Sequence, residues 1–236
     1  MGMVRGVRMG LVLFAGVLLY VTAFHVAGMA VLHPTARTVC MVSKPPAGEV
    51  TFPVDLAETT LRIEKAVFYE GPFLEDGGDR PVVGVLALLV RNTGDRSLET
   101  AQITLTDARA TYRFQGRHIL PGSRVLLLET GGAAFKQTGF LTARGYATEE
   151  EADLLQTGEV EIEDVSMGSV TVTNRTDRTL YDLRLYYKNY LSDGDLYQGG
   201  ICYETRIETL AAGQSVTLDP HHYAMGYSCF VWAQEA

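Results

Sequence analysis

The sequence predicts an all-β protein in which an N-terminal transmembrane helix is followed by two tandem antiparallel β-sandwiches. The first observation is a repeat: residues 90–98 read VRNTGDRSL and residues 172–180 read VTNRTDRTL, 82 positions later. The second is that alternating apolar residues follow each copy, as in a strand with one buried face. The third is the closely spaced Gly, Pro and Asp punctuation, without a long segment of helical period, which is typical of a sandwich.

The N-terminal segment has the length and composition of a membrane anchor. Residues 9–32 contain no Asp, Glu, Lys or Arg, and about 20 apolar residues suffice to cross a bilayer as a helix. Arg5 and Arg8 precede this stretch, so the positive-inside rule places residues 1–8 in the cytoplasm. We therefore expect a single-pass protein of the cell membrane with most of the chain extracytoplasmic. A cleaved signal peptide is the alternative, although its apolar core is usually shorter.

The charge composition limits the classes of molecule that the protein can be expected to bind. The 236 residues carry 20 Lys and Arg against 28 Asp and Glu, a formal net charge of −8. Nucleic-acid binding needs a basic surface that neutralises phosphates, so we expect no nucleic-acid partner. The membrane is expected as a partner through the helix alone, because an acidic surface does not dock on anionic lipid.

A spacer and a first sandwich follow the anchor. The spacer is residues 33–48, whose Pro45 and Pro46 favour an extended chain. The sandwich is residues 49–148, and residues 82–90 are so uniformly apolar that we expect a strand buried on both faces. The other expected strands are 60–69, 99–106, 111–114, 125–128 and one that opens at 139–142.

A linker and a second sandwich complete the chain. Residues 149–158 are expected to form a linker with a short helix, because Thr148 and Glu151 have capping-box spacing, or else a charged loop. The second sandwich, 159–236, repeats the order of the first. Its expected strands are 160–165, 169–173, 181–190, 201–210 and 214–218, followed by a closing strand. About nine extra residues, 191–199, distinguish it from the first, and such loops often carry binding function.

The order of strand, Asn-containing turn, Leu, alternating strand and Leu-x-Gly turn resembles the FxLYD and CARDB-type immunoglobulin-like modules of bacterial surface proteins. The resemblance covers each half separately, and Leu180-Tyr181-Asp182 partly echoes the motif that names the first family. It implies two immunoglobulin-like domains in an extracytoplasmic setting. Those modules share no catalytic residues, so the resemblance implies no active site.

Two cysteines fall on two predicted strands of the second half. Cys202 and Cys229 would lie outside the reducing cytosol, where disulfides persist, and we expect them to form one. The alternative is a pair of buried thiols that act as small apolar fillers. Cys40 is left over, either free or linked to a second chain.

Motifs for catalysis or metal binding are absent from the sequence. It has no Gly-x-Ser-x-Gly, Ser-x-x-Lys, His-Glu-x-x-His or phosphate loop. The acidic turns at Asp76, Asp79, Asp193 and Asp195 lack the spacing of a calcium loop. His221 and His222 are adjacent, so on an extended chain they point in opposite directions. We expect no enzyme, metal or small-molecule cofactor; a hydrolase with a dispersed site is the alternative.

The candidate contact surface is one face of the strand at 181–190. If Leu183, Leu185 and Tyr187 point inward, the other face presents basic and aromatic side chains, which suit a protein or glycan partner. The candidate binding residues are Arg184, Tyr186, Lys188, Tyr190 and Tyr197. The alternative is that the first half covers this face. The expected function is interaction or envelope assembly, with an accessory role in a membrane complex as a further alternative.

Overall fold

The computed structural model describes residues 50–78, 80–135, 139–150, 153–191 and 196–235, together with the backbone of 37–41. The predicted anchor at 9–32 lies outside these residues, as do Asp79, Asp193 and Asp195 and the side chains of Cys40 and Asp76. No helix in the described part of the chain is long and apolar enough to cross a membrane.

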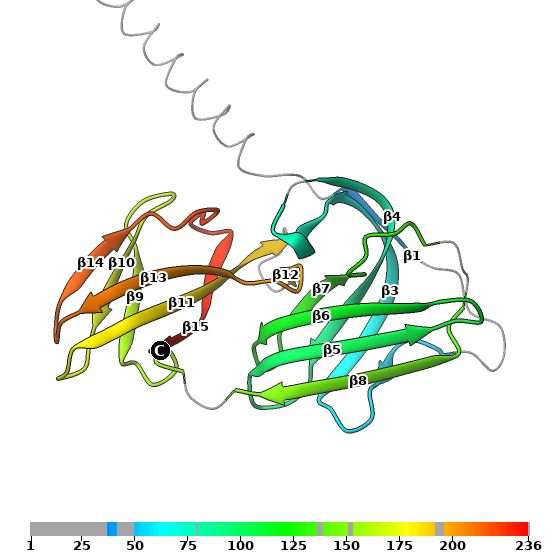
Figure 1. Cartoon of the computed structure of the whole chain (residues 1–236), viewed down its shortest axis with the longest axis horizontal. Helices are drawn as coiled ribbons and strands as arrows, with labels where there is room; N and C mark the ends of the chain where they lie inside the picture. The colour runs from blue at the N-terminus through cyan, green and yellow to red at the C-terminus, as the bar shows by residue number, and fades with distance from the viewer. Residues whose placement is uncertain are drawn as a thin grey trace, which may run out of the picture. The chain divides into compact units, whose positions relative to one another are not determined.

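The described residues form an all-β fold, which confirms the predicted class (Figure 1). The only regular helix among them is the short 3₁₀ turn η1 (Leu74–Asp76). The strands of the first half are β1 (Arg37–Met41), β2 (Val54–Asp55), β3 (Leu61–Pro72), β4 (Pro81–Asn92), β5 (Leu98–Thr106), β6 (Thr111–Ile119), β7 (Arg124–Leu128) and β8 (Thr142–Glu149). Those of the second half are β9 (Val160–Asp164), β10 (Val170–Asn174), β11 (Leu180–Leu191), β12 (Leu196–Gln198), β13 (Tyr203–Leu210), β14 (Ser215–Leu218) and β15 (Ser228–Glu235).

The two halves share one strand order. In the first half β4 lies between β3 and β7, and β5 lies between β6 and β8. In the second half β10 lies between β9 and β14, and β11 lies between β13 and β15. All eight pairings are antiparallel, so each half contains the same two three-stranded units.

Hydrophobic patterning accounts for both types of strand. Residues 85–90 of β4 are all buried, as expected for a strand covered on both faces. In β5, Ala101, Ile103 and Leu105 are buried while Gln102 is exposed, so the alternating pattern fits one buried face. The equivalent positions Leu183 and Leu185 of β11 are fully buried in the core of the second half.

The repeated asparagine explains the repeated motif. Asn92 and Asn174 are completely buried, each at the end of the central strand of its unit. The Asn92 Nδ2 donates to the carbonyls of Arg96 at 2.7 Å and Ile119 at 3.1 Å. The Asn174 Nδ2 donates to those of Arg178 at 2.7 Å and Leu210 at 2.9 Å. Each amide therefore closes its own turn and ties that turn to the end of a strand in the other sheet.

The same Asn side chains also accept hydrogen bonds within their turns. The Asn92 Oδ1 accepts from the backbone N–H of Gly94 at 3.0 Å, and the Asn174 Oδ1 accepts from that of Thr176 at 2.9 Å. A buried amide that makes all these bonds offsets the cost of its own desolvation. In each half the asparagine of the motif thus fixes the turn and connects it to the facing sheet.

The repeated arginine has a structural role as well. Arg96 pairs with Glu149 at the end of β8, and Arg178 pairs with Glu235 at the end of β15. Both ion pairs join the turn to the last strand of the respective half. The Arg in each motif is therefore neutralised by a carboxylate at the equivalent place.

The halves are joined by more than a linker. Strand β12, from the predicted insertion at 191–199, pairs in parallel with β7 of the first half, with Tyr197 opposite Val125. It also pairs with β11, so one hydrogen-bonded sheet runs through both halves. Residues 36–236 accordingly form one compact unit.

The predicted linker helix is wrong in the residues described. Thr148 and Glu149 belong to β8, and residues 154–158 form turns. The Thr148 hydroxyl meets that of Thr100 on β5 at 2.6 Å, so cross-strand pairing outweighs the local capping signal. The alternative of a solvated charged loop agrees with the turns, but Glu150 and Asp153 are buried.

Replacing Asn92 with Ala should remove the hydrogen bonds to the carbonyls of Arg96 and Ile119 and the bond from the Gly94 N–H, of which the bond to Ile119 is buried. We expect the free energy of unfolding to fall by about 2–4 kcal/mol, and Asn174→Ala should cost a similar amount. Urea unfolding of the purified chain measures this. Gln102→Ala, which truncates an exposed amide on β5, is the matched control and should change stability little. A loss of stability in Asn92→Ala no larger than that in Gln102→Ala would contradict the structural role of the asparagine.

Candidate functional site at the joint between the halves

The predicted contact face is mostly covered. Tyr186 is 6% exposed, Lys188 1% and Tyr197 5%, while Arg184 and Tyr190 are partly exposed. The Tyr186 ring lies 4.7 Å from the ring of His118 in the first half, measured between centroids. For Tyr186, therefore, the alternative prediction holds: the first half covers this face.

The other aromatic residues of that face pair with each other. Tyr190 and Tyr197 lie opposite each other in β11 and β12, and their rings stack at 4.9 Å. Arg184 donates to Asp182 on its own strand at 3.2 Å. The five residues thus do not form an exposed surface for a partner.

The predicted disulfide is wrong, because Cys202 and Cys229 are both free thiols. Cys229 lies opposite Lys188 in the β11–β15 pair, whereas Cys202 precedes β13 on the other side of β11. Two strand spacings amount to about 9.5 Å, beyond the Cα separation of about 7 Å that a disulfide permits. Burial raises the pKa of the Cys202 thiol, whose Sγ lies 3.5 Å from the Arg117 carbonyl.

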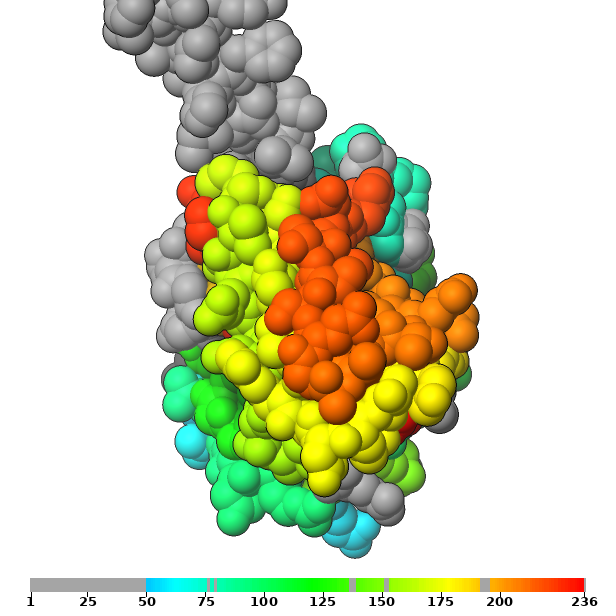
Figure 2. Space-filling model, turned by 90° about the vertical axis from the view of Figure 1, so that its left-hand side faces the viewer, coloured from blue at the N-terminus to red at the C-terminus, as the bar shows by residue number. Residues whose placement is uncertain are grey.

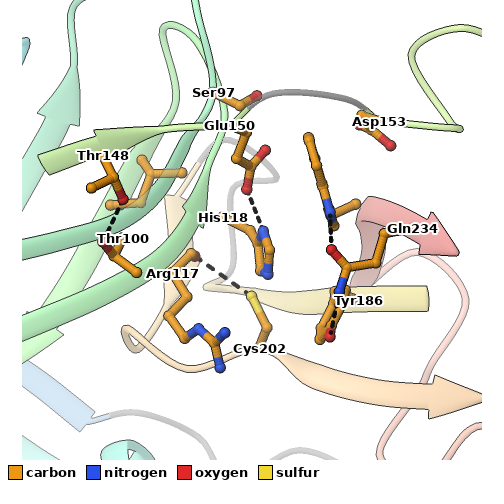
Figure 3. A network of polar contacts seen from close by, with 12 residues as sticks. Ser97, Thr100, Arg117, His118, Thr148, Glu150, Asp153, Tyr186, Cys202 and Gln234 are labelled. Atoms are coloured by element: carbon orange, nitrogen blue, oxygen red, sulfur yellow. Dashed lines mark hydrogen bonds and ion pairs between the residues drawn. The ribbon is translucent and has the colours of Figure 1, made fainter. Parts of the chain in front are cut away.

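His118 is the centre of a buried polar cluster that the sequence analysis did not identify (Figure 3). It lies near the end of β6, is 3% exposed and has a left-handed backbone with φ of 48°. Its Nδ1 contacts Glu150 Oε1, and its ring stacks on Trp232 at 5.7 Å. The first half therefore places a strained histidine against two aromatic rings of the second half.

Burial favours the neutral forms of both His118 and Glu150. Desolvation, with the charges of Arg117 and Lys188, lowers the pKa of His118 to about 4. Desolvation, with repulsion from Asp153 and Glu99, raises the pKa of Glu150 to about 8. Both shifts favour the uncharged forms of the two groups near neutral pH.

A glycine of the second half is inserted between strands of the first. The Gly200 N–H donates to both carboxylate oxygens of Glu75, at 3.0 and 2.9 Å. Its carbonyl accepts from the Arg117 N–H at 2.9 Å, and the neighbouring Gly199 N–H donates to the Leu126 carbonyl at 3.0 Å. A Cβ on Gly200 would lie 1.7 Å from the Gln115 carbonyl oxygen, so no other residue fits.

Two ionisable side chains hold this insertion, the buried Lys188 and the half-buried Glu75. The Lys188 Nζ donates to the carbonyl of Ile201 at 2.9 Å. Glu75 also accepts from the Leu128 N–H at 2.7 Å, and desolvation raises the pKa of its carboxyl to about 7. The candidate lysine of the predicted surface is therefore a buried structural cation.

His221 and His222 lie elsewhere, and the expectation that they point in opposite directions is wrong, because the left-handed backbone of His222 brings their ring centroids to 3.9 Å. The His221 carbonyl accepts from the Tyr187 hydroxyl, and the His222 ring lies 5.1 Å from that of Tyr203. Within the described ranges no group of three His, Cys, Asp or Glu residues could hold a metal ion. The structure does not bring these histidines to the cluster around His118.

A small cavity opens beside Glu150, with a volume of about 90 Å³. It lies where the β4–β5 turn meets the connection after β8 and the last strand of the second half. Its lining residues are Arg96, Ser97, Glu150, Asp153, Gln156 and Trp232. This polar lining, with one aromatic wall, is the arrangement at the joint that can accept a ligand group.

Comparison with models of known protein families and with curated proteins finds no match for this chain.

Replacing Gly200 with Ala should force the inserted segment out of the first half. We expect a loss of about 3 kcal/mol or more in unfolding free energy, because backbone atoms must move to relieve the overlap. Gly168→Ala is the matched control, since its nearest neighbour would lie 3.9 Å from the new Cβ. Urea unfolding of both variants tests this, and equal stability would contradict the insertion.

Replacing Glu150 with Gln should flatten the dependence of stability on pH. From about pH 4.5 to 8 the folded chain holds a proton on Glu150 that the unfolded chain has released, so stability falls as pH rises. Gln mimics the protonated acid and removes this contribution, up to about 1.4 kcal/mol per pH unit.

Urea unfolding at several pH values between 5.5 and 7.5 measures these slopes. His118 acts in the opposite direction, since its lowered pKa makes stability fall as pH drops from about 6.5 to 4. The control Glu163→Gln alters an exposed carboxylate and should keep the wild-type slope. An unchanged slope in Glu150→Gln would show that the carboxyl is ionised in the folded chain.

Proposed function

We propose that this chain is a membrane-anchored extracytoplasmic protein that uses its paired β-sandwiches to bind or assemble with another component of the cell envelope. The apolar stretch at 9–32, the preceding Arg5 and Arg8 and the Pro-containing spacer support the anchor and its orientation. The acidic net charge supports a protein or glycan partner and disfavours nucleic acid.

The observation that carries this proposal is a group of exposed apolar side chains on two loops of the second half. Val165, Met167, Met225 and Tyr227 are 59%, 43%, 36% and 40% exposed. The Met225 N–H donates to the Met167 carbonyl at 2.9 Å, so the two loops lie side by side (Figure 2). Grouped exposed apolar side chains mark interaction sites more often than single ones do.

The joint gives this surface a fixed position. Because β12 is hydrogen-bonded to β7 and Gly200 is enclosed by the first half, the two halves cannot turn independently. A partner that contacts both halves loses no hinge entropy on binding. A rigid scaffold with loop contacts is therefore the function that this geometry supports best.

An enzyme is the second candidate, and one observation favours it. His118 is bonded through Nδ1 to an acid, as a catalytic histidine often is, and its Nε2 has no hydrogen-bond partner. The nearby Cys202 has a raised pKa, however, whereas a nucleophilic thiol needs a lowered one. This weighs against a Cys–His hydrolase at this place.

A membrane-impermeant crosslinker tests location and contact together. Met167→Cys, labelled on intact spheroplasts with an impermeant maleimide photo-crosslinker, should give an adduct with an envelope partner. The matched control is Val83→Cys, which places the probe on an exposed apolar position of β4, and wild type reports labelling of the native thiols. Labelling of Met167→Cys only after permeabilisation would contradict the proposed location. Equal crosslinking from both positions would contradict the loop surface.

A further inference from the structure

We propose that the cavity beside Glu150 is a binding site for a guanidinium group, carried either by a free small molecule or by an arginine side chain of a partner. The site lies at the joint and is separate from the exposed loops of the second half. It does not depend on where in the cell the protein resides.

Charge is the first argument. The guanidinium of Arg96 lines the cavity but is paired with Glu149, as Arg178 is paired with Glu235 in the second half. The repeat therefore accounts for the positive charge of Arg96. Glu150 and Asp153 are the acidic groups of the lining, and no ion pair joins either of them to a Lys or Arg among the described residues. Glu150 adds its negative charge when the pH exceeds its pKa of about 8.

An unpartnered oxygen is the second argument. Glu150 is 7% exposed; its Oε1 contacts His118, while its Oε2 is buried without a hydrogen-bond partner. The free oxygen lies on the side of the carboxyl away from His118, toward Asp153 (Figure 3). An unsatisfied buried acceptor costs free energy, so a ligand that donates a hydrogen bond there gains more than at a solvated oxygen.

The structure of the other lining residues favours a flat cation. Asp153 Oδ1 accepts from the N–H groups of Leu155 and Ala233 at 2.9 and 3.0 Å, which fixes this carboxylate on the far side of the cavity. Trp232 supplies an aromatic wall, and a guanidinium stacks on aromatic faces while donating in its plane.

Size limits the ligand to a small group. The cavity volume of about 90 Å³ is below the roughly 150 Å³ that accommodates benzene in an engineered core. A guanidinium with one attached carbon fits this limit. The site would therefore take the end of an arginine side chain or a molecule such as methylguanidinium.

The only tryptophan of the chain provides a direct readout, because Trp232 lines the cavity. We expect methylguanidinium, titrated at pH 8.5 into the full chain in detergent, to change the fluorescence saturably. This pH lies above the Glu150 pKa of about 8, so most of the carboxyl is ionised. Methylurea, the neutral analogue of similar shape, should bind at least tenfold more weakly. Equal responses to the two probes would overturn the proposal without any mutation.

The variants test the carboxylates separately from the fold. Glu150→Gln should weaken methylguanidinium binding at least tenfold, and Asp153→Asn should weaken it as well. Glu163→Gln, on the exposed edge strand β9, should leave binding unchanged. Retained affinity in a folded Glu150→Gln protein would also overturn the proposal.

The source of the group is decided by comparing free methylguanidinium with a Gly-Arg-Gly peptide. Tighter binding of the peptide assigns the site to a partner's arginine, and exclusion of the peptide assigns it to a small molecule. Both results require the Glu150-dependent response to methylguanidinium. Binding of Ca²⁺ in preference to methylguanidinium would contradict the proposed ligand class.

Discussion

Burying an amide at the end of the central strand of each half is the constraint on which this structure depends. Asn92 and Asn174 lie where the chain leaves one sheet and enters the other. Each links its own turn with the end of the facing sheet, at Ile119 and Leu210 respectively. With these bonds in place, the strand order stays the same although Ala101, Ile103 and Leu105 of the first half are replaced by Leu183, Leu185 and Tyr187 in the second.

The residues at the joint between the halves are not part of the pattern that the two halves share. Ile119 and Leu210 are equivalent positions, because the carbonyl of each accepts a hydrogen bond from the repeated asparagine. The counterpart of His118 is then Thr209, so the described second half has no equivalent of the His118–Glu150 pair. Strand β12 comes from the extra residues of the second half, and Gly200 directly follows them. A repeated scaffold has thus acquired, at one place, a set of buried polar groups that the scaffold itself does not require.

How far the sequence predicts the structure depends on the range of the interaction. The alternation in β5 and the apolar run in β4 predicted their strands, because burial on one or two faces is visible in local periodicity. The outer face of β11 follows the same alternation, yet Tyr186 and Lys188 are covered by contacts that no local pattern reveals. Cys202 and Cys229 illustrate the same limit, since strand order rather than spacing decides whether two thiols meet. His118 had no local signal at all, and its role follows only from Glu150, Tyr186 and Trp232.

The parallel pairing of β12 with β7 means that the first half is not a self-sufficient module. A chain ending before the second half would leave the backbone groups of β7 exposed along an apolar strand, which is a template for intermolecular pairing. The residues that distinguish the second half therefore also protect the first from aggregation, and shuffling either half into another protein would carry this liability with it.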